Sequence, residues 1–395
     1  MKFPNMKRPV LALALGLSVG VSRLPAQAQG RVYGDIYVPD SSVERPRDIG
    51  SRFHTNHLIM VQPRGGLGPS GGMTPAQIRS FYSIPSTGGH DVIAIVGAYD
   101  YPNALADFNT FATKFGLPTE TSKTVTATTN KVFQVIYQNG KKPTGNVGWA
   151  QESALDIEWA HAMAPKAKIV LLEAQSSGLA DLLATVDLAV KQTGVKQVSM
   201  SWGSSEFSSE ASYDFHFNIN GPVFFSSSGD VGGITSFPST SSYVVAVGGT
   251  SVATNSTGAF LSETGWSGSG GGVSAYETRP SWQSGIANTG AKRSVPDISS
   301  DANPSTGVQV YGPGSNGVSG WLVFGGTSVS SPCIAGMVNV GGATYTNTTQ
   351  LLTKIYSKLG ATSLRDITVG NSGFSCLTGW DFVTGVGAPV GTTGF

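Results

Sequence analysis

Short apolar runs rich in β-branched residues alternate with segments of helical period along the chain after residue 73. The predicted strands are residues 92–96, 131–137, 169–174, 198–202, 223–227 and 244–247. The predicted helices are residues 104–115, 152–164, 179–193 and 331–340. Strands that are apolar throughout, with helices between them, are typical of a parallel sheet covered on both faces. We therefore predict an α/β fold, with residues 251–320, which are rich in Gly and Ser, mostly as loop.

The first 72 residues differ from this pattern. Basic residues precede an apolar run at 10–21, and Ala26-Gln27-Ala28 follows, which predicts a secretory signal peptide at residues 1–28 and a secreted, extracellular protein. A membrane anchor is the alternative, but about twelve apolar residues are too few for a bilayer that needs about twenty. Residues 29–72 are polar and rich in Pro and Gly, which indicates a loose arm or short leader. Residues 73–395 form the predicted α/β domain.

The low charge of the chain limits its partners. Charged residues make up 12% of the sequence and the net charge is +1, which gives no basic surface for nucleic acid. Few charges suit an acid-exposed surface, although Gly/Ser/Thr-rich surfaces are also common outside cells. Cys333 and Cys376 could form one disulfide in an oxidising compartment, and the sequence leaves that pairing open. Neither has a metal ligand at zinc spacing.

Residues 325–332, Gly-Gly-Thr-Ser-Val-Ser-Ser-Pro, predict a serine nucleophile at a helix start. Pro332 lacks an amide proton and suits the first turn, so the helix should begin near Ser328. The free amides of a helix start favour negative charge that develops on a bound carbonyl oxygen. The alternative is an ordinary helix-capping role for Ser328 or Ser330. None of the five histidines lies in a run suited to serve this serine as a base.

Two acids on another predicted helix could replace the histidine. Glu152 and Asp156 are one turn apart, only about 40° around the helix axis, and their neighbours are apolar. Buried together, such carboxyl groups titrate as a coupled pair, in which one holds a proton while the other can accept one. A solvated acidic face is the alternative. His161 lies about 180° from Glu152 and is interpreted as a packing or surface histidine.

Asp230 follows a predicted strand and is preceded by Gly229. The carboxyl end of a strand in an open parallel sheet is where binding sites form, so Asp230 should point into the same cleft. In a dry site it would be protonated and could donate a hydrogen bond to an oxyanion. Its alternative role is that of a turn residue.

Taken together, these motifs resemble the sedolisin, or serine-carboxyl, peptidases, a family with a subtilisin-like fold and a Ser-Glu-Asp triad. The matching motifs are Glu152-x-x-x-Asp156, residues 199–203 (Ser-Met-Ser-Trp-Gly), residues 228–230 (Ser-Gly-Asp) and residues 326–332. The resemblance implies a single subtilisin-like catalytic domain in which Ser328 is the nucleophile and Glu152 its base. It implies that Asp156 orients Glu152 and that Asp230 is the oxyanion acid. The family usually carries a long folded propeptide, whereas only about forty residues separate the predicted signal from the catalytic region.

The resemblance also implies binding segments. Extended substrate would add as a β-strand to two segments that could otherwise be plain loops. These segments are Ser201, Trp202 and Gly203, and Gly270, Gly271 and Gly272.

One structural Ca²⁺ is implied near the C-terminus, where a Gly/Asp turn is the alternative. Its oxygen ligands would be Asp366, Ile367, Gly379 and Asp381, with Ile367 and Gly379 contributing backbone carbonyls. Leu377 stands where the family has another glycine.

The leading hypothesis is a secreted, acid-active serine peptidase that forms an acyl-enzyme on protein or peptide substrates and is a monomer. A non-catalytic peptide-binding protein and an esterase-type serine hydrolase are the alternatives. The sequence leaves side-chain preference and internal or terminal cleavage open.

Overall fold

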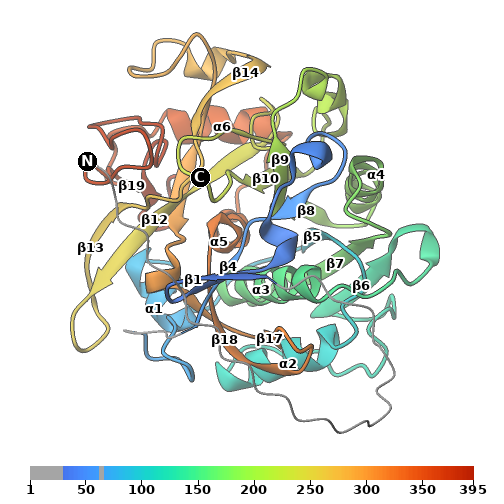
Figure 1. Cartoon of the computed structure of the whole chain (residues 1–395). Helices are drawn as coiled ribbons and strands as arrows, with labels where there is room; N and C mark the ends of the chain where they lie inside the picture. Colours follow the sequence, from blue (N-terminus) through green and yellow to red (C-terminus); the bar gives the residue numbers. More distant parts are fainter. Residues whose placement is uncertain (1–29, 62–65) are drawn as a thin grey trace, which may run out of the picture.

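The main sheet of the computed structural model, which describes residues 30–61 and 66–395, has eight strands (Figure 1). The predicted signal peptide lies outside these residues. The strand order is β13-β12-β10-β8-β5-β7-β6, and β16 also pairs with β12. All pairs are parallel except β12 with β13. The strands are β5 (Val92–Ala98), β6 (Phe133–Tyr137), β7 (Lys168–Ala174), β8 (Val195–Met200), β10 (Val223–Ser227), β12 (Val245–Thr254), β13 (Phe260–Gly265) and β16 (Ile298–Asp301).

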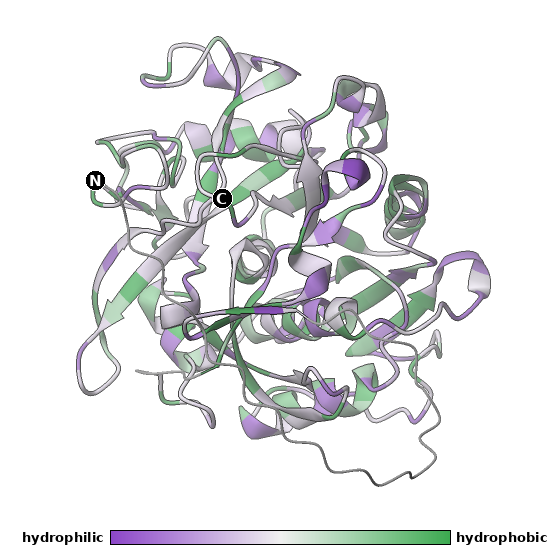
Figure 2. Cartoon of the chain, in the orientation of Figure 1, coloured by the Kyte–Doolittle hydropathy of each residue, from purple (hydrophilic) through white to green (hydrophobic). Residues whose placement is uncertain are grey.

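Helices cover both faces of this sheet. They are α1 (Pro75–Phe81), α2 (Ala104–Lys114), α3 (Val147–Met163), α4 (Leu179–Val190), α5 (Thr327–Gly341) and α6 (Thr348–Tyr356). Side chains alternate along a strand, so Ile93 and Ile95 of β5 pack in the core that contains α3 and α5, while Val96 packs in the core that contains α4. Figure 2 shows these central strands as hydrophobic. The predicted subtilisin-like α/β architecture is confirmed.

Helix α3 is buried on nearly every side. The Asn146 side chain caps it by accepting a hydrogen bond from Trp149 N, and every residue from Trp149 to Met163 is buried. The helix therefore begins five residues before the predicted start. Because α3 packs against α5, α2 and the sheet, its acidic residues lie inside the protein rather than on a solvated face.

Two local predictions were wrong. Helix α5 begins at Thr327, which confirms the start near Ser328 but lies four residues before the predicted range 331–340. Pro332 therefore falls in the second turn and not in the first, and proline there cannot donate to Ser328 O. About half of residues 251–320 lie in strands, because edge hairpins carry Gly and Ser in place of continuous apolar runs. These strands are β12, β13 and β16, with β14 (Gly272–Thr278), β15 (Lys292–Val295), β17 (Val308–Pro313) and the start of β18 (Ser319–Gly325).

The N-terminal arm, residues 30–61, is paired with the domain rather than loose. Its strands are β1 (Arg31–Tyr33), β2 (Ile36–Val38), β3 (His54–Thr55) and β4 (Leu58–Met60). Strand β4 pairs with β18, which places β1, β2 and β4 in a sheet with β18 and β17. Strand β3 instead pairs with β9 (Trp202–Ser205), and β9 pairs on its other edge with β11 (Ser236–Phe237).

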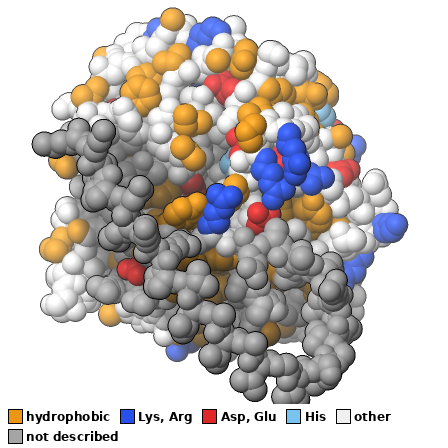
Figure 3. Space-filling view, in the orientation of Figure 1, with side chains coloured by type: hydrophobic (Ala, Val, Ile, Leu, Met, Phe, Trp, Pro, Cys, Tyr) orange, Lys and Arg blue, Asp and Glu red, His pale blue; other side chains and the backbone are white. Residues whose placement is uncertain are grey.

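Four further observations concern the two cysteines, the C-terminal strands, the lengths of the helices and the charge of the surface. Cys333 and Cys376 are both buried and unpaired. Two short strands, β19 (Leu364–Arg365) and β20 (Ala388–Pro389), pair near the C-terminus. Over residues 30–61 and 66–395, the helices are all too short or too polar to cross a bilayer. On the face in Figure 3, basic side chains occupy only a few places on a largely uncharged surface.

Candidate active site

Helix α5 places its first amides inside the protein, next to the arm. Gly326 precedes it with a φ of 100°, a conformation that favours glycine. Thr327 N donates to Asp230 Oδ1 at 2.7 Å, and Thr327 Oγ1 donates to the same oxygen at 2.8 Å. Ser328 N donates to the backbone oxygen of Asn56 in the arm at 3.0 Å. At the start of α5, the Thr327 amide thus binds the Asp230 carboxyl group and the Ser328 amide binds the Asn56 carbonyl.

Ser328 and Glu152 meet directly. The Ser328 hydroxyl donates to Glu152 Oε2 at 2.9 Å. Glu152 is 1% exposed and Ser328 is 0% exposed. The same oxygen accepts the Asn56 amide at 3.2 Å and contacts His57 Nδ1 at 3.0 Å. The geometry is that of a hydroxyl hydrogen-bonded to a carboxyl group that could take its proton.

Asp156 lies beside this pair but does not touch Glu152 through a hydrogen bond in the described part of the chain. Its Oδ1 accepts from the Ser201 hydroxyl at 2.6 Å. Burial raises the pKa of Glu152 well above its usual value, and burial together with the nearby Glu152 charge does the same to the pKa of Asp156. A charge on one of the two acids therefore disfavours ionisation of the other.

Asp230 faces the same carbonyl. Its Oδ1 is occupied by Thr327, whereas its Oδ2 is buried without a hydrogen-bond partner among the described residues. Burial raises the pKa of Asp230 to about 7. A methyl group on Gly326 would lie 2.3 Å from Asn56 O and 2.5 Å from Asp230 Oδ2, so both oxygens lie against this glycine. A protonated Oδ2 is placed to donate towards that carbonyl.

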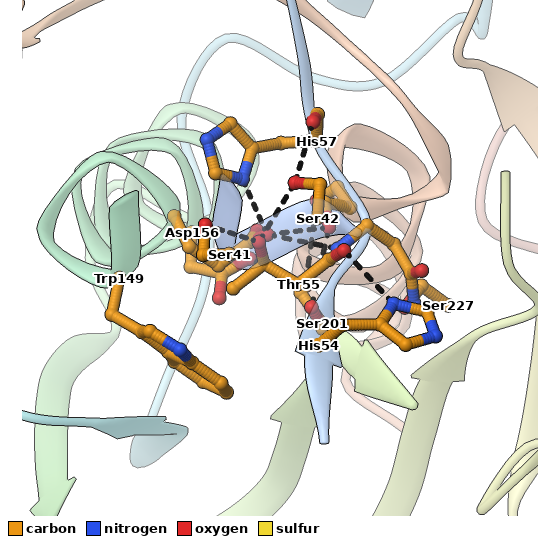
Figure 4. A network of polar contacts seen from close by, with 12 residues as sticks. Ser41, Ser42, His54, Thr55, His57, Trp149, Asp156, Ser201 and Ser227 are labelled. Atoms are coloured by element: carbon orange, nitrogen blue, oxygen red, sulfur yellow. Dashed lines mark hydrogen bonds and ion pairs between the residues drawn. The ribbon is translucent and has the colours of Figure 1, made fainter. Parts of the chain in front are cut away.

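His57 is the site residue that sequence reasoning missed. No histidine was assigned a role, yet His57 of the arm contacts Glu152 and is fully buried. Burial lowers the pKa of His57 to about 4, so its ring is neutral above about pH 4. The hydroxyl of Ser328 donates to Glu152 and not to this imidazole. Figure 4 shows the His57 ring facing the cluster that contains Asp156 and Ser201.

His161, on α3, is a packing residue. It is buried, its Nε2 is 2.8 Å from Pro118 O, and its ring lies 4.7 Å from that of Phe108. It takes no part in the site.

The first predicted binding segment lies along the arm. In β9, Trp202 pairs with Thr55 and Gly203 with His54, and Asn56 N donates to Ser201 O at 3.3 Å. The second predicted segment is different: Gly270 N and Gly271 N donate to Gly229 O and Ile234 O, and Gly272 pairs with Val295.

A segment that sequence reasoning missed borders the arm on its other side. Phe53 N donates to Ser177 O at 2.8 Å, and Leu179 N donates to Ser51 O at 3.0 Å. Arg52 forms a bridge with Gly178. The signal that could have identified residues 177–179 is their position directly after the carboxyl end of β7.

The C-terminal loop brings the predicted calcium ligands together in part. Gly379 N donates to Asp366 Oδ2 at 3.0 Å. Asp381 is buried and accepts the amides of Leu377, Val383 and Thr384. Within residues 30–61 and 66–395, no group of three or more His, Cys, Asp or Glu is spaced to hold a metal. The carbonyls of Ile367 and Gly379 accept no hydrogen bond from described residues, so an all-oxygen donor set is possible there.

Comparisons with known proteins show which family this chain belongs to. A model of the subtilase family (Peptidase_S8) matches residues 119–363, more than half of the chain. Sedolisin of Pseudomonas sp. (strain 101) is 28% identical over 81% of this chain and 60% of its own length. Kumamolisin of Bacillus sp. (strain MN-32) is 31% identical over 80% of this chain and 62% of its own length.

A solved structure extends the likeness to the fold. Pseudomonas sedolisin, described as a serine-carboxyl proteinase complexed with two molecules of pseudo-iodotyrostatin, has a TM-score of 0.67 and 28% identity. The match covers 80% of this chain and 95% of that structure. The chain spans about 60% of the length of the sedolisin and kumamolisin sequences it matches. On the family model and the shared fold together, this chain belongs to the subtilase family, among relatives of the sedolisin type.

Proposed function

We propose that the chain is a secreted serine-carboxyl peptidase that cleaves protein or peptide substrates at acidic pH. The observation that carries the proposal is the 2.9 Å hydrogen bond from Ser328 Oγ to buried Glu152. The match to the subtilase (Peptidase_S8) family model and the likeness to a structure described as a serine-carboxyl proteinase support the proposal. Secretion rests on the signal-like sequence of residues 1–28 alone.

Each residue has a chemical role in this proposal. Glu152 accepts the hydroxyl proton as Ser328 attacks the carbonyl carbon, and it later returns that proton to the leaving amine. Asp156 acts on Glu152 through its charge and accepts a hydrogen bond from Ser201, so we assign it a positioning role. The Ser328 amide and protonated Asp230 stabilise the oxyanion. Water then releases the acyl group from Ser328.

The raised pKa of Asp230 is the reason why we expect activity at acidic pH. Its pKa of about 7 means that it carries a proton below that pH and can donate it in a hydrogen bond. Two buried acids away from the site support an acid working range as well. Burial and a neighbouring acid raise the pKa of Glu210 to about 9 and that of Glu277 to about 8. The folded state thus binds more protons than the unfolded chain between about pH 4 and these values, so stability falls as pH rises through that window.

Casein cleavage by the parent and by a Ser328 variant tests the proposed peptidase function. The protein is expected to cleave casein at acidic pH, and Ser328→Ala is expected to remove that cleavage while the melting temperature stays close to that of the parent. Peptide products are measured by mass spectrometry. Cleavage of simple esters without cleavage of any peptide would favour the esterase alternative, and equal casein cleavage by the alanine variant would overturn the role of Ser328.

We also propose one structural Ca²⁺ in the C-terminal loop. Asp366 and Asp381 would supply carboxylate oxygens, with the carbonyls of Ile367 and Gly379, and the bound ion would tie the loop together.

Calcium at about 100 times its dissociation constant should add about 2.7 kcal/mol to the free energy of unfolding. The melting temperature is measured with Ca²⁺, with Mg²⁺ and with a chelator. Asp366→Asn should lose the Ca²⁺ shift, and Asp91→Asn, a change at an exposed acid outside this loop, should keep it. An identical melting temperature with Ca²⁺ and chelator would contradict this site.

A further inference from the structure

Ser201 follows the carboxyl end of β8, and its side chain faces helices α3 and α5. Side chains alternate along a strand, and Met200 and Trp202 pack in the core that contains α4. Ser201 therefore points to the opposite side of the sheet, as does Ser199, whose hydroxyl lies 3.0 Å from that of Ser331 on α5. Ser199 and Ser201 are both fully buried. The resemblance placed Ser201 in a substrate-binding segment, whereas its hydroxyl is directed into the protein.

The Ser201 hydroxyl donates its hydrogen bond to Asp156. Its oxygen lies 2.6 Å from Asp156 Oδ1, which is a distance typical of a hydroxyl bound to a charged carboxylate. The other acceptor within reach, Ser328 O, is 3.5 Å away. Because a hydroxyl has a single proton, that proton goes to the nearer oxygen, which belongs to Asp156. Figure 4 shows Ser201 and Asp156 in the same polar network.

The backbone of Ser201 lies next to the nucleophile. Its carbonyl oxygen is 3.3 Å from Ser328 Oγ and accepts the Asn56 amide, also at 3.3 Å. One residue thus contacts an acid on α3, the nucleophile on α5 and the strand that runs along β9. A substitution of the Ser201 side chain leaves the carbonyl in place, so the role of the hydroxyl can be tested separately.

The surroundings of Asp156 supply no other stabilising group for a negative charge. Among residues 30–61 and 66–395, its carboxyl group takes part in no ion pair and accepts no hydrogen bond except the one from Ser201. The titratable groups near it are Glu152 on α3 and Cys333 on α5, and next to Glu152 lie His57 and Asp230. Above about pH 4 none of these groups is positively charged.

The geometry points to Ser201 as a positioning residue of the candidate active site, whose hydroxyl fixes the Asp156 carboxyl group and allows the pair of Glu152 and Asp156 to lose its first proton in acid. This inference rests on the proposed function and deepens it. A donated hydrogen bond stabilises the pair after it has lost one proton, relative to the fully protonated pair. Without the hydroxyl, a higher pH is needed before the pair ionises, and the Asp156 carboxyl group is free to rotate.

The test measures the pH dependence of kcat for the full chain, Ser201→Ala and Ser201→Thr, with an internally quenched peptide that has no titratable groups. In Ser201→Ala the midpoint of the acidic limb should move up by about one pH unit, the size expected when a hydrogen bond to a charged group is lost. KM should stay close to that of the parent. Ser201→Thr keeps the hydroxyl and should keep the limb at the parent position. Melting temperatures at each pH separate unfolding from loss of chemistry.

Two further variants serve as controls. Ser199→Ala removes an equally buried hydroxyl from the same strand and the same side of the sheet, but one that lies against a neutral hydroxyl. Its acidic limb should coincide with that of the parent. In Asp156→Asn, the further change Ser201→Ala should move the limb no further, because the asparagine does not ionise. If Ser201→Ala does not fold, Ser201→Cys takes its place, since a thiol is a weaker donor and should move the limb in the same direction.

The outcomes separate this inference from the proposed function. A parent-like acidic limb in Ser201→Ala, or an equal movement in Ser199→Ala, overturns the role of Ser201 and leaves the peptidase proposal in place. A rise in KM of about tenfold with an unmoved limb also overturns it, because such a result assigns Ser201 to substrate binding. Absence of peptide cleavage by the parent at every pH overturns the proposed function itself.

Discussion

Glu152→Gln is expected to lower kcat/KM for a peptide substrate about 10⁴-fold or more. Glutamine has nearly the shape of protonated glutamic acid, so it can still accept the Ser328 hydrogen bond that is now 2.9 Å long. It cannot accept a proton at any pH at which the protein is folded. The loss should therefore fall on kcat, and steady-state kinetics with an internally quenched peptide will measure it.

A matched control lies on the same helix. Glu158 is also buried on α3 and has a pKa raised by burial, but it accepts the Tyr311 amide away from the site. Glu158→Gln should keep activity close to that of the parent. Two results would contradict the carboxylate base: parent-like kcat in Glu152→Gln, or a loss in His57→Ala as deep as that in Glu152→Gln.

Asp230→Ala is expected to lower kcat about 10²- to 10³-fold at pH values below about 7, where the parent side chain carries its proton, as the removal of one oxyanion donor does in other serine hydrolases. The parent should lose activity as pH rises through about 7, because Asp230 then loses the proton that it donates. Asp230→Asn keeps a neutral donor whose charge does not change with pH. Its alkaline limb should be flattened or moved to higher pH.

The profile is best measured on a peptide without titratable groups, with melting temperatures at each pH to separate unfolding from loss of chemistry. An alkaline limb that stays at about pH 7 in Asp230→Asn would assign that limb to another group. Full activity in Asp230→Ala would remove Asp230 from the oxyanion site.

The central sheet could be predicted because its strands are buried on both faces. Strand β10 was predicted with its observed bounds, residues 223–227, since a strand covered by helices must be apolar throughout. Strand β14 was missed because it is exposed at alternate positions and is rich in small residues. Helix α1 was missed although Thr74 and Gln77 form a capping box, and α6 although Leu351, Leu352 and Ile355 follow a helical period.

The residues of the site also differ in how well they could be predicted from the sequence. Ser328 and Glu152 could be brought together from local motifs on two predicted helices, and their contact is present in the structure. His57 and Ser177 could not, because each reaches the cleft through strand pairing between distant segments. Pairing of short strands depends on backbone register, which leaves little trace in composition. The one sign in the arm was the apolar patch at residues 58–61.

The pairing of β4 with β18 has a consequence for the space beside Glu152. Leu58 and Ile59 are paired with Gly325 and Phe324, which holds the preceding residue, His57, in contact with Glu152. The backbone of the arm therefore occupies this side of the site, and an added peptide can lie there only when residues 54–57 have moved away from β9.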